Sequence, residues 1–168
     1  ALEASQFGMI VTISVLIDQL RGVVGTGFVI TSPYSMDRFC RGYRSGGGKA
    51  AAVVRPGTLL EQWRVLKLCI AADAIIIMQA ANTGLTEGSA PSGVYDRDVV
   101  VLSTNRMSKI QIIQNGEQII AFPGATLHAL EEQLRPLNRQ PHSVIGSSCV
   151  GASIVGGVCN NSGGSLIE

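Results

Sequence analysis

Residues 75–89 read IIIMQAANTGLTEGS, an apolar run followed at once by a loop of small residues. The apolar part, Ile75–Gln79, predicts a buried β-strand, and the loop at residues 80–89 carries Gly84 and Gly88 among short hydroxyl and amide side chains. Glycine permits positive φ and removes the side chain that would hold a ligand away from backbone N–H groups. The loop therefore predicts a cradle for a diphosphate, although a tight turn between two strands would also explain the glycines.

A second cluster of small residues supports the cradle. It covers residues 146–153 and continues through residues 156–165. Gly84 and Gly88 do not match the G-x-G-x-x-G motif of dinucleotide-binding folds, and no G-K-[ST] follows them. The two clusters instead suggest that one extended ligand is held from two sides.

Regular elements are predicted upstream of the loop. Residues 11–23 carry apolar side chains on one helical face, and residues 34–48 predict an irregular, basic connector. A short buried strand at residues 51–55 leads into a helix opened by a capping box at residues 58–61. Because Ile75–Gln79 is the next strand, the unit is β-α-β, and its loop leaves the carboxyl end of a parallel strand, where open α/β sheets hold ligands.

The helix after the capping box is predicted to direct four apolar side chains inward: Leu59, Trp63, Leu66 and Ile70. Trp63 is interpreted as a core residue rather than as a ring that stacks on a ligand, because it lies at helical spacing beside leucines.

Downstream of the loop, the pattern changes to strands. Val99–Ser103 is an apolar run, and the runs at residues 110–114 and 117–122 flank Asn115-Gly116, which is typical of a type I′ hairpin turn. A helix is predicted at residues 127–134. The mixture of parallel and antiparallel elements predicts an α+β fold.

Composition narrows the class of protein. The chain has 168 residues, of which 46% are hydrophobic and 15% charged, so it can bury a real core. Its formal net charge of +1 gives no indication of the basic surface that binds nucleic acid. The apolar run at residues 7–17 is too short to span a bilayer and has no basic segment before it. We therefore expect a cytoplasmic protein without a transmembrane segment.

Cysteines and histidines show no pattern of a metal site. The four cysteines form no C-x-x-C pair, and no histidine stands at zinc-ligand spacing. We expect reduced, mostly buried cysteines and no metal. His128 and His142 are interpreted as a helix-surface and a loop residue, because neither lies among the glycines.

Five segments carry a resemblance to a known family: residues 39–48, 55–73, 75–89, 95–100 and 141–165. They are similar to the FAD-binding domain of the respiratory, quinone-linked, FAD-dependent D-lactate dehydrogenases, which belong to the flavoproteins with the vanillyl-alcohol-oxidase fold. The resemblance implies a PCMH-type FAD-binding domain over residues 46–168, incomplete at its C-terminus. It also implies that residues 1–45 form an N-terminal helix and connector.

The resemblance implies FAD contacts from both clusters: Ala80, Ala81, Asn82, Thr83, Gly84, Gly88 and Ser89 around the diphosphate, and Gly146, Ser153 and Gly163 from the second cluster. Such a site is chemically sound, because two phosphates need several N–H donors more than they need a cation. Neither cluster contains a histidine, so we expect noncovalent FAD.

The implied activity is oxidation of D-lactate to pyruvate by hydride transfer to FAD, with electrons passed to a membrane quinone. The full-length enzyme is expected to be peripheral on the cytoplasmic face of the inner membrane. No catalytic residue is identified, because the substrate site and the proton acceptor are expected beyond Glu168, in a capping domain. Another 2-hydroxy acid as substrate, reduction of a sugar nucleotide and a truncated, non-catalytic module stay open as alternatives.

Overall fold

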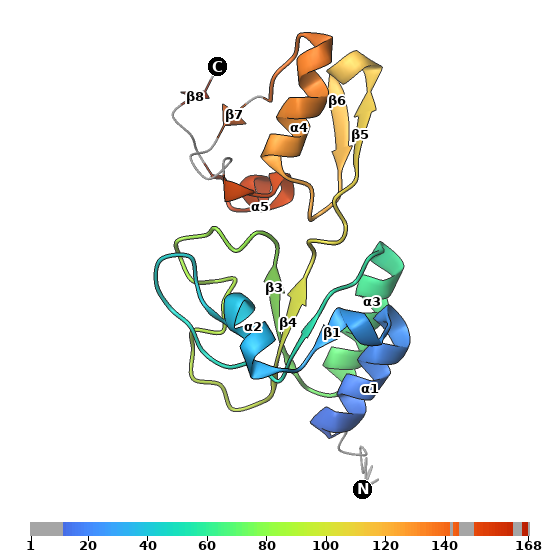
Figure 1. Cartoon of the computed structure of the whole chain (residues 1–168), viewed down its shortest axis with the longest axis vertical. Helices are drawn as coiled ribbons and strands as arrows, with labels where there is room; N and C mark the ends of the chain where they lie inside the picture. The colour runs from blue at the N-terminus through green and yellow to red at the C-terminus, as the bar shows by residue number, and fades with distance from the viewer. Residues whose placement is uncertain (1–11, 142, 145–149, 163–165, 168) are drawn as a thin grey trace, which may run out of the picture.

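The computed structural model describes residues 12–141, 143–144, 150–162 and 166–167. These residues form two lobes, one above the other in Figure 1. The lower lobe contains, in chain order, α1 (Ile13–Val24), η1 (Thr26–Phe28), β1 (Val29–Ile30), α2 (Pro33–Cys40), β2 (Ala52–Val54), α3 (Leu59–Ala71), β3 (Ile75–Gln79) and β4 (Val99–Ser103). The upper lobe contains β5 (Ile110–Ile113), η2 (Gln114–Gly116), β6 (Gln118–Ala121), α4 (Leu127–Leu134), η3 (Arg135–Leu137), β7 (Ser143–Val144), α5 (Ile154–Cys159) and β8 (Leu166–Ile167).

Strand β4 lies inside the main sheet, whose order is β1-β2-β4-β3. Val101 of β4 pairs in parallel with Val53 of β2 on one side and with Ile77 of β3 on the other. The predicted β-α-β unit is thus confirmed, with β4 inserted between its two strands. Antiparallel β1, together with the β5-β6 and β7-β8 pairs, confirms the predicted α+β class.

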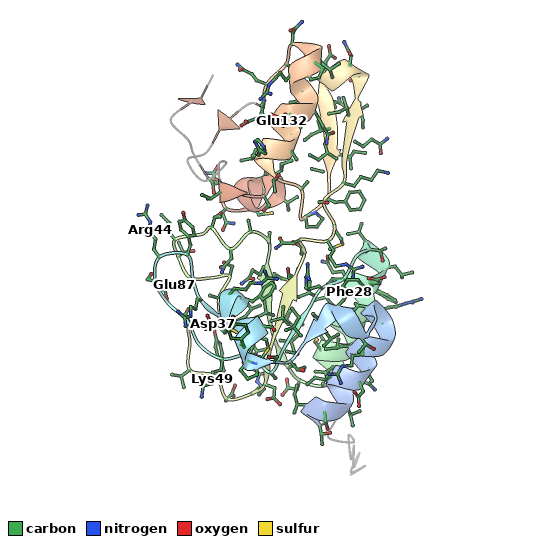
Figure 2. All side chains as sticks on the ribbon, in the orientation of Figure 1. Phe28, Asp37, Arg44, Lys49, Glu87 and Glu132 are labelled. Atoms are coloured by element: carbon green, nitrogen blue, oxygen red, sulfur yellow. The ribbon has the colours of Figure 1, made fainter. Side chains whose placement is uncertain are left out.

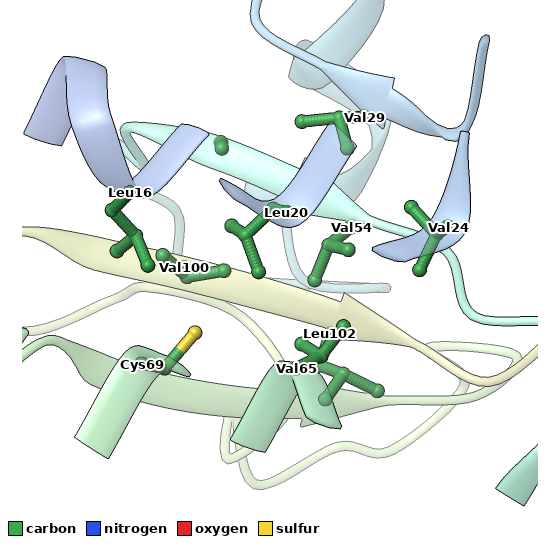
Figure 3. Packing of buried hydrophobic residues seen from close by; sticks show 10 residues of the cluster. Leu16, Leu20, Val24, Val29, Val54, Val65, Cys69, Val100 and Leu102 are labelled. Carbon is green, nitrogen blue, oxygen red and sulfur yellow. The ribbon is translucent and has the colours of Figure 1, made fainter. Parts of the chain in front are cut away.

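Both faces of β4 are buried, because helices cover the sheet on each side. Val100 and Leu102 face α1 and α3 (Figure 3). Val99 and Val101 face α2. Side chains alternate between the faces of a strand, so a run of apolar residues suits a strand covered on both sides.

Helix α1 confirms the prediction for residues 11–23. Leu16, Leu20 and Val24 are its buried residues and point to the sheet in Figure 3. Gly25, with a φ of 89°, follows the last helical residue and lets the chain turn away.

Helix α2 contradicts the irregular connector that we predict for residues 34–48. Pro33 stands in its first turn after Ser32, where a fixed φ suits helix entry. Met36, Phe39 and Cys40 are buried against the sheet. The basic residues of this segment led us to miss a short amphipathic helix, and only residues 41–48 are irregular.

The predicted cap of α3 at Thr58 is confirmed, but the Glu61 carboxylate bonds to Gly57 and not to Thr58 as in a capping box, and the predicted inward face is wrong. The Thr58 hydroxyl accepts a hydrogen bond from the Glu61 N–H at 3.1 Å, and the Glu61 carboxylate accepts one from the Gly57 N–H at 2.7 Å. The buried residues of α3 are Val65 and Cys69.

Of the four residues that we predict to point inward, Leu59, Trp63 and Ile70 are exposed, and Leu66 is partly buried. Trp63 is 55% exposed and stacks with the Lys67 ammonium at 4.7 Å. The helix is apolar on more than one side, so periodicity alone does not identify the face that meets the sheet.

The β5-β6 hairpin is confirmed, but its turn is wider than a type I′ turn. The last paired residues are Ile113 and Gln118, which leaves residues 114–117 in the loop. Gln114, Asn115 and Gly116 all have positive φ, whereas a two-residue type I′ turn needs this only at its two central residues.

Helix α4 confirms the prediction for residues 127–134, with the Thr126 hydroxyl accepting from the Ala129 N–H at 3.1 Å. His128 is exposed on its surface, as predicted, and His142 lies outside the described residues. The division of the chain between residues 45 and 46 stays a prediction. None of the helices in the described ranges has the length and apolarity needed to cross a membrane.

The cysteines follow their predicted environment only in part. Cys40 and Cys69 are buried and Cys159 is exposed, all as free thiols, while Cys149 lies outside the described residues. Burial raises the pKa of the Cys69 thiol to about 11. Burial is also the main cause of the raised pKa of Cys40. Both buried thiols are therefore protonated and unreactive at neutral pH.

The burial of β4 predicts the effect of shortening one of its side chains. Leu102→Ala should lower the free energy of unfolding by about 2–5 kcal/mol, because it removes methyl groups from a fully buried site. Denaturant unfolding followed by circular dichroism measures the change. Met78→Ala is the matched control, since Met78 of β3 is 43% exposed and its truncation should cost much less. Equal losses for the two variants would contradict the central position of β4.

Candidate functional site

The loop at residues 80–89, called the cradle loop below, begins at the carboxyl end of β3. In Figure 1 this end of β3 points towards the upper lobe, and the loop runs along the edge of the lower lobe that faces it. The chain then returns through residues 90–98 to start β4. The cradle loop therefore lies at the sheet edge where open parallel sheets bind ligands.

Backbone N–H groups of the cradle loop are free. Among the described residues, the N–H groups of residues 81–89 donate no hydrogen bond to the protein, and the first that does beyond them is Ala90, to the Glu87 carbonyl at 3.0 Å. Unpaired N–H groups on one short segment are donors that an anionic group can use. This is the property predicted for a diphosphate cradle.

The glycines of the loop border open space. A Cβ on Gly84 would meet no heavy atom within 4 Å, and one on Gly88 would meet only the Thr86 hydroxyl, at 3.9 Å. Gly84 and Gly88 do not use the positive φ that glycine permits, because the left-handed residues of the loop are Asn82, with φ of 55°, and Glu87, with φ of 61°. Gly84 and Gly88 thus serve by lacking a side chain.

Asn82 and Gln79 tie the loop to the rest of the lower lobe. The Asn82 amide donates to the Arg41 carbonyl at 2.6 Å and accepts from the Ser89 hydroxyl at 2.7 Å. The buried Gln79 amide donates to the Phe39 carbonyl at 2.9 Å and to the Ser89 carbonyl at 2.6 Å. The two ends of the loop are therefore held together and against the segment that follows α2.

The predicted site residues of this loop lie together on one segment. Ala80, Ala81, Asn82, Thr83 and Ser89 are partly buried, whereas Gly84 and Gly88 are exposed. The acidic residue of the loop is Glu87 (Figure 2), and its carboxylate lies against Gly46. The exposed residues of the loop are Gly84, Leu85, Thr86 and Gly88, so its open surface carries no charge and one large apolar side chain, that of Leu85.

The second predicted cluster is only partly described, since Gly146 and Gly163 lie outside the described residues. Ser153 caps α5 by accepting a hydrogen bond from the Gly156 N–H at 3.1 Å. Backbone bonds from the Leu127 N–H to the Ala152 carbonyl and from the Ile154 N–H to the Ala125 carbonyl fix Ser153 beside the start of α4. In Figure 1, α5 lies at the base of the upper lobe, facing the lower one.

One buried hydroxyl at the same edge of the sheet lacks a partner. Ser103, the last residue of β4, is fully buried and pairs in register with Gln79. Its hydroxyl makes no hydrogen bond within the described residues. A buried polar group without a partner is uncommon in folded proteins.

Sequence reasoning missed Gln79 and the Arg41 carbonyl as parts of this site. Gln79 could have been noticed as a polar residue at the end of an otherwise apolar strand. The Arg41 carbonyl had no signal, because its bond to Asn82 joins residues 41 positions apart in the sequence.

Comparison with known families identifies a match over most of the chain. The family model described as FAD binding domain matches residues 50–168. The match includes the cradle loop and the second cluster of small residues.

The chain is similar to quinone-dependent D-lactate dehydrogenases. It is 59% identical over 153 residues to that of Escherichia coli (strain K12), which covers 90% of this chain and 27% of the relative. It is 56% identical over 154 residues to that of Haemophilus influenzae, which covers 91% of this chain and 27% of the relative. The chain thus spans 27% of the length of these relatives.

Solved structures with low sequence identity share the fold. A structure of alkyldihydroxyacetonephosphate synthase aligns with a TM-score of 0.77 and 15% identity, covering 89% of this chain and 30% of that one. A structure of p-cresol methylhydroxylase aligns with a TM-score of 0.74 and 19% identity, covering 88% of this chain and 29% of that one. The PCMH-type fold is therefore present.

Proposed function

Because this chain belongs to the FAD binding domain family, we propose that it is the cofactor-binding part of a quinone-dependent D-lactate dehydrogenase. The observation that carries the proposal is the 59% identity over 153 residues to the Escherichia coli enzyme of that name. Sequence identity this high over 90% of the chain is stronger support for one particular activity than a shared fold is.

In this proposal, the cradle loop holds the FAD diphosphate. The free N–H groups of residues 81–89 and the open space before Gly84 fit two phosphates, which need donors and close approach. Ala80, Ala81, Asn82, Thr83, Gly84, Gly88 and Ser89 line the diphosphate, and Gly146, Ser153 and Gly163 of the second cluster also contact the cofactor. The cap that the Ser153 hydroxyl forms leaves its O–H free to donate.

When bound, FAD accepts the hydride that leaves the α-carbon of D-lactate, which becomes pyruvate, and its electrons pass to a membrane quinone. The described residues bind and orient the cofactor. The complete enzyme reaches the quinone as a peripheral protein on the cytoplasmic face of the inner membrane. No proton acceptor is assigned to the described residues.

The open space at Gly84 predicts a loss of flavin without a loss of fold. Gly84→Val should lower the flavin content of the purified protein at least tenfold, because its side chain enters the space of the phosphates and its Cβ meets no protein atom within 4 Å. Flavin absorbance per protein and far-ultraviolet circular dichroism measure the two effects. Gly22→Val is the matched control, since Gly22 of α1 is equally open and distant from the loop. If both variants keep their flavin, the loop is a turn without a ligand.

The absence of a histidine from both clusters predicts noncovalent FAD. Acid precipitation of the yellow protein should release the flavin into the supernatant, where its absorbance is read. Flavin that stays in the pellet after washing would show a covalent link and would overturn this assignment.

The proposed substrate predicts stereoselective turnover by the natural protein that carries this segment. It should reduce a soluble quinone analogue with D-lactate at a rate well above that with L-lactate, while the 168-residue chain by itself should not. The assay follows bleaching of the quinone analogue. Reduction of a sugar nucleotide with no response to hydroxy acids would assign the chain to the alternative activity, and turnover by the 168-residue chain would place the active site within it.

A further inference from the structure

A second irregular loop, residues 41–48, lies beside the cradle loop and is called the clamp loop below. It closes on itself through an antiparallel bridge between Arg41 and Gly47 and a hydrogen bond from the Gly42 N–H to the Gly46 carbonyl at 3.0 Å. The Gly48 N–H also donates to the Cys40 carbonyl at 3.0 Å, which anchors the loop to the end of α2. The clamp loop thus has the internal backbone bonds that the cradle loop lacks.

Side chains of the cradle loop and of the strand before it bond to backbone carbonyls around the start of the clamp loop. Asn82 reaches the Arg41 carbonyl at 2.6 Å, and the buried Gln79 reaches the Phe39 carbonyl at 2.9 Å. Both amides also bond to Ser89, so they join the two ends of the cradle loop. Carbonyls of residues 39 and 41 therefore hold Gln79 and Asn82 at the beginning of the cradle loop, and these two side chains hold its end through Ser89.

Gly46 and Gly48 of the clamp loop leave no room for a side chain, because they pack against Glu87 of the cradle loop and against Pro91 just after it. A Cβ on Gly46, whose φ is +75°, would overlap the carboxylate of Glu87, and a Cβ on Gly48 would overlap the carbonyl of Pro91. In Figure 2, Arg44 of the clamp loop and Glu87 lie on the same side of the lower lobe. The clamp loop thus supports the cradle loop through contacts as well as through hydrogen bonds.

We propose that the clamp loop preorganises the cradle loop for the diphosphate, with Asn82 and Gln79 as positioning residues. The inference rests on the proposed function, because it takes the ligand of the cradle loop to be FAD. The oxygen and one N–H of the Asn82 side-chain amide bond within the protein. The backbone N–H of Asn82 makes no bond to the described residues and can donate to the ligand. A loop without backbone bonds of its own loses conformational entropy when it orders around a ligand, and ordering it beforehand improves affinity.

The test compares Asn82→Gly with Gly84→Val in the natural protein that carries this segment, first without FAD and then with it. Glycine keeps the left-handed φ of position 82, adds no charge and removes both side-chain bonds. Limited proteolysis by a glutamate-specific protease reports the order of the cradle loop in the FAD-free protein, through the cleavage rate after Glu87. Flavin fluorescence titration measures the Kd for FAD, and a thermal melt checks the global fold.

We expect Asn82→Gly to raise the cleavage rate after Glu87 at least fivefold and to weaken FAD binding at least tenfold. Gly84→Val should weaken FAD binding with cleavage unchanged, since its side chain affects only the ligand side. Ser89→Ala added to Asn82→Gly should weaken FAD binding little further, because both changes remove the same bond. Saturating FAD should return the cleavage rate of Asn82→Gly towards that of the wild type.

Weaker FAD binding by Asn82→Gly with an unchanged cleavage rate would overturn the inference, because the Asn82 side chain would then act on the ligand itself and not on the order of the loop. Unchanged binding with faster cleavage would overturn it as well, because the order of the loop would not matter to the ligand. A wild-type protein that binds no FAD would overturn the proposed function and, with it, FAD as the ligand. Faster cleavage of Asn82→Gly in that protein would still establish the contact between the loops.

Discussion

Burial of β4 on both faces is the constraint on which the rest of the structure depends. A strand of five apolar or small residues with no exposed side chain must lie inside a sheet, and other elements must cover both faces of the sheet there. α1 and α3 cover one face, α2 covers the other, and parallel β2 and β3 flank the strand. Since β3 precedes β4 and runs parallel to it, the chain has to return from the carboxyl end of one strand to the start of the next.

That return usually takes a helix, but here residues 80–98 make it without one. A helix would satisfy its own backbone groups, whereas this connection leaves the N–H groups of residues 81–89 free and relies on side chains for order. Asn82 tolerates its left-handed backbone better than most residues do, and Glu87 adopts the same region at some cost in strain. The free donors and the strained backbone of the cradle loop thus have a common origin in the parallel pairing of β3 and β4.

Fold and substrate are supported by different observations. Structures with 15–19% identity share the fold at TM-scores of 0.74–0.77, yet their names describe different reactions. Architecture therefore does not select the substrate. D-lactate enters the proposal through the much higher identity to dehydrogenases of that name, whereas the cofactor is supported by both the family match and the cradle loop.

Local signals in the sequence were sufficient for α1, β2, α3, β3, β4, β5, β6 and α4, but not for β1, α2, β7, α5 or β8. Periodic apolar residues predicted α1, apolar runs predicted β3 and β4, and the capping residues Thr58 and Glu61 marked the start of α3, because each of these signals acts within a few positions of the chain. The sequence also placed the small-residue loop at the end of a parallel strand, which is where the structure has it.

Only tertiary structure decided which residues meet. α3 is apolar on more than one side, so its contact with the sheet, and not its period, selected Val65 and Cys69 over Trp63 as buried residues. Helix α2 is stabilised by burial of Met36 and Phe39 against the sheet. The basic residues around them gave no sign of this burial in the sequence. The bond between Asn82 and the Arg41 carbonyl spans 41 positions and involves a backbone group that every residue type has, so no pattern of residue types could reveal it.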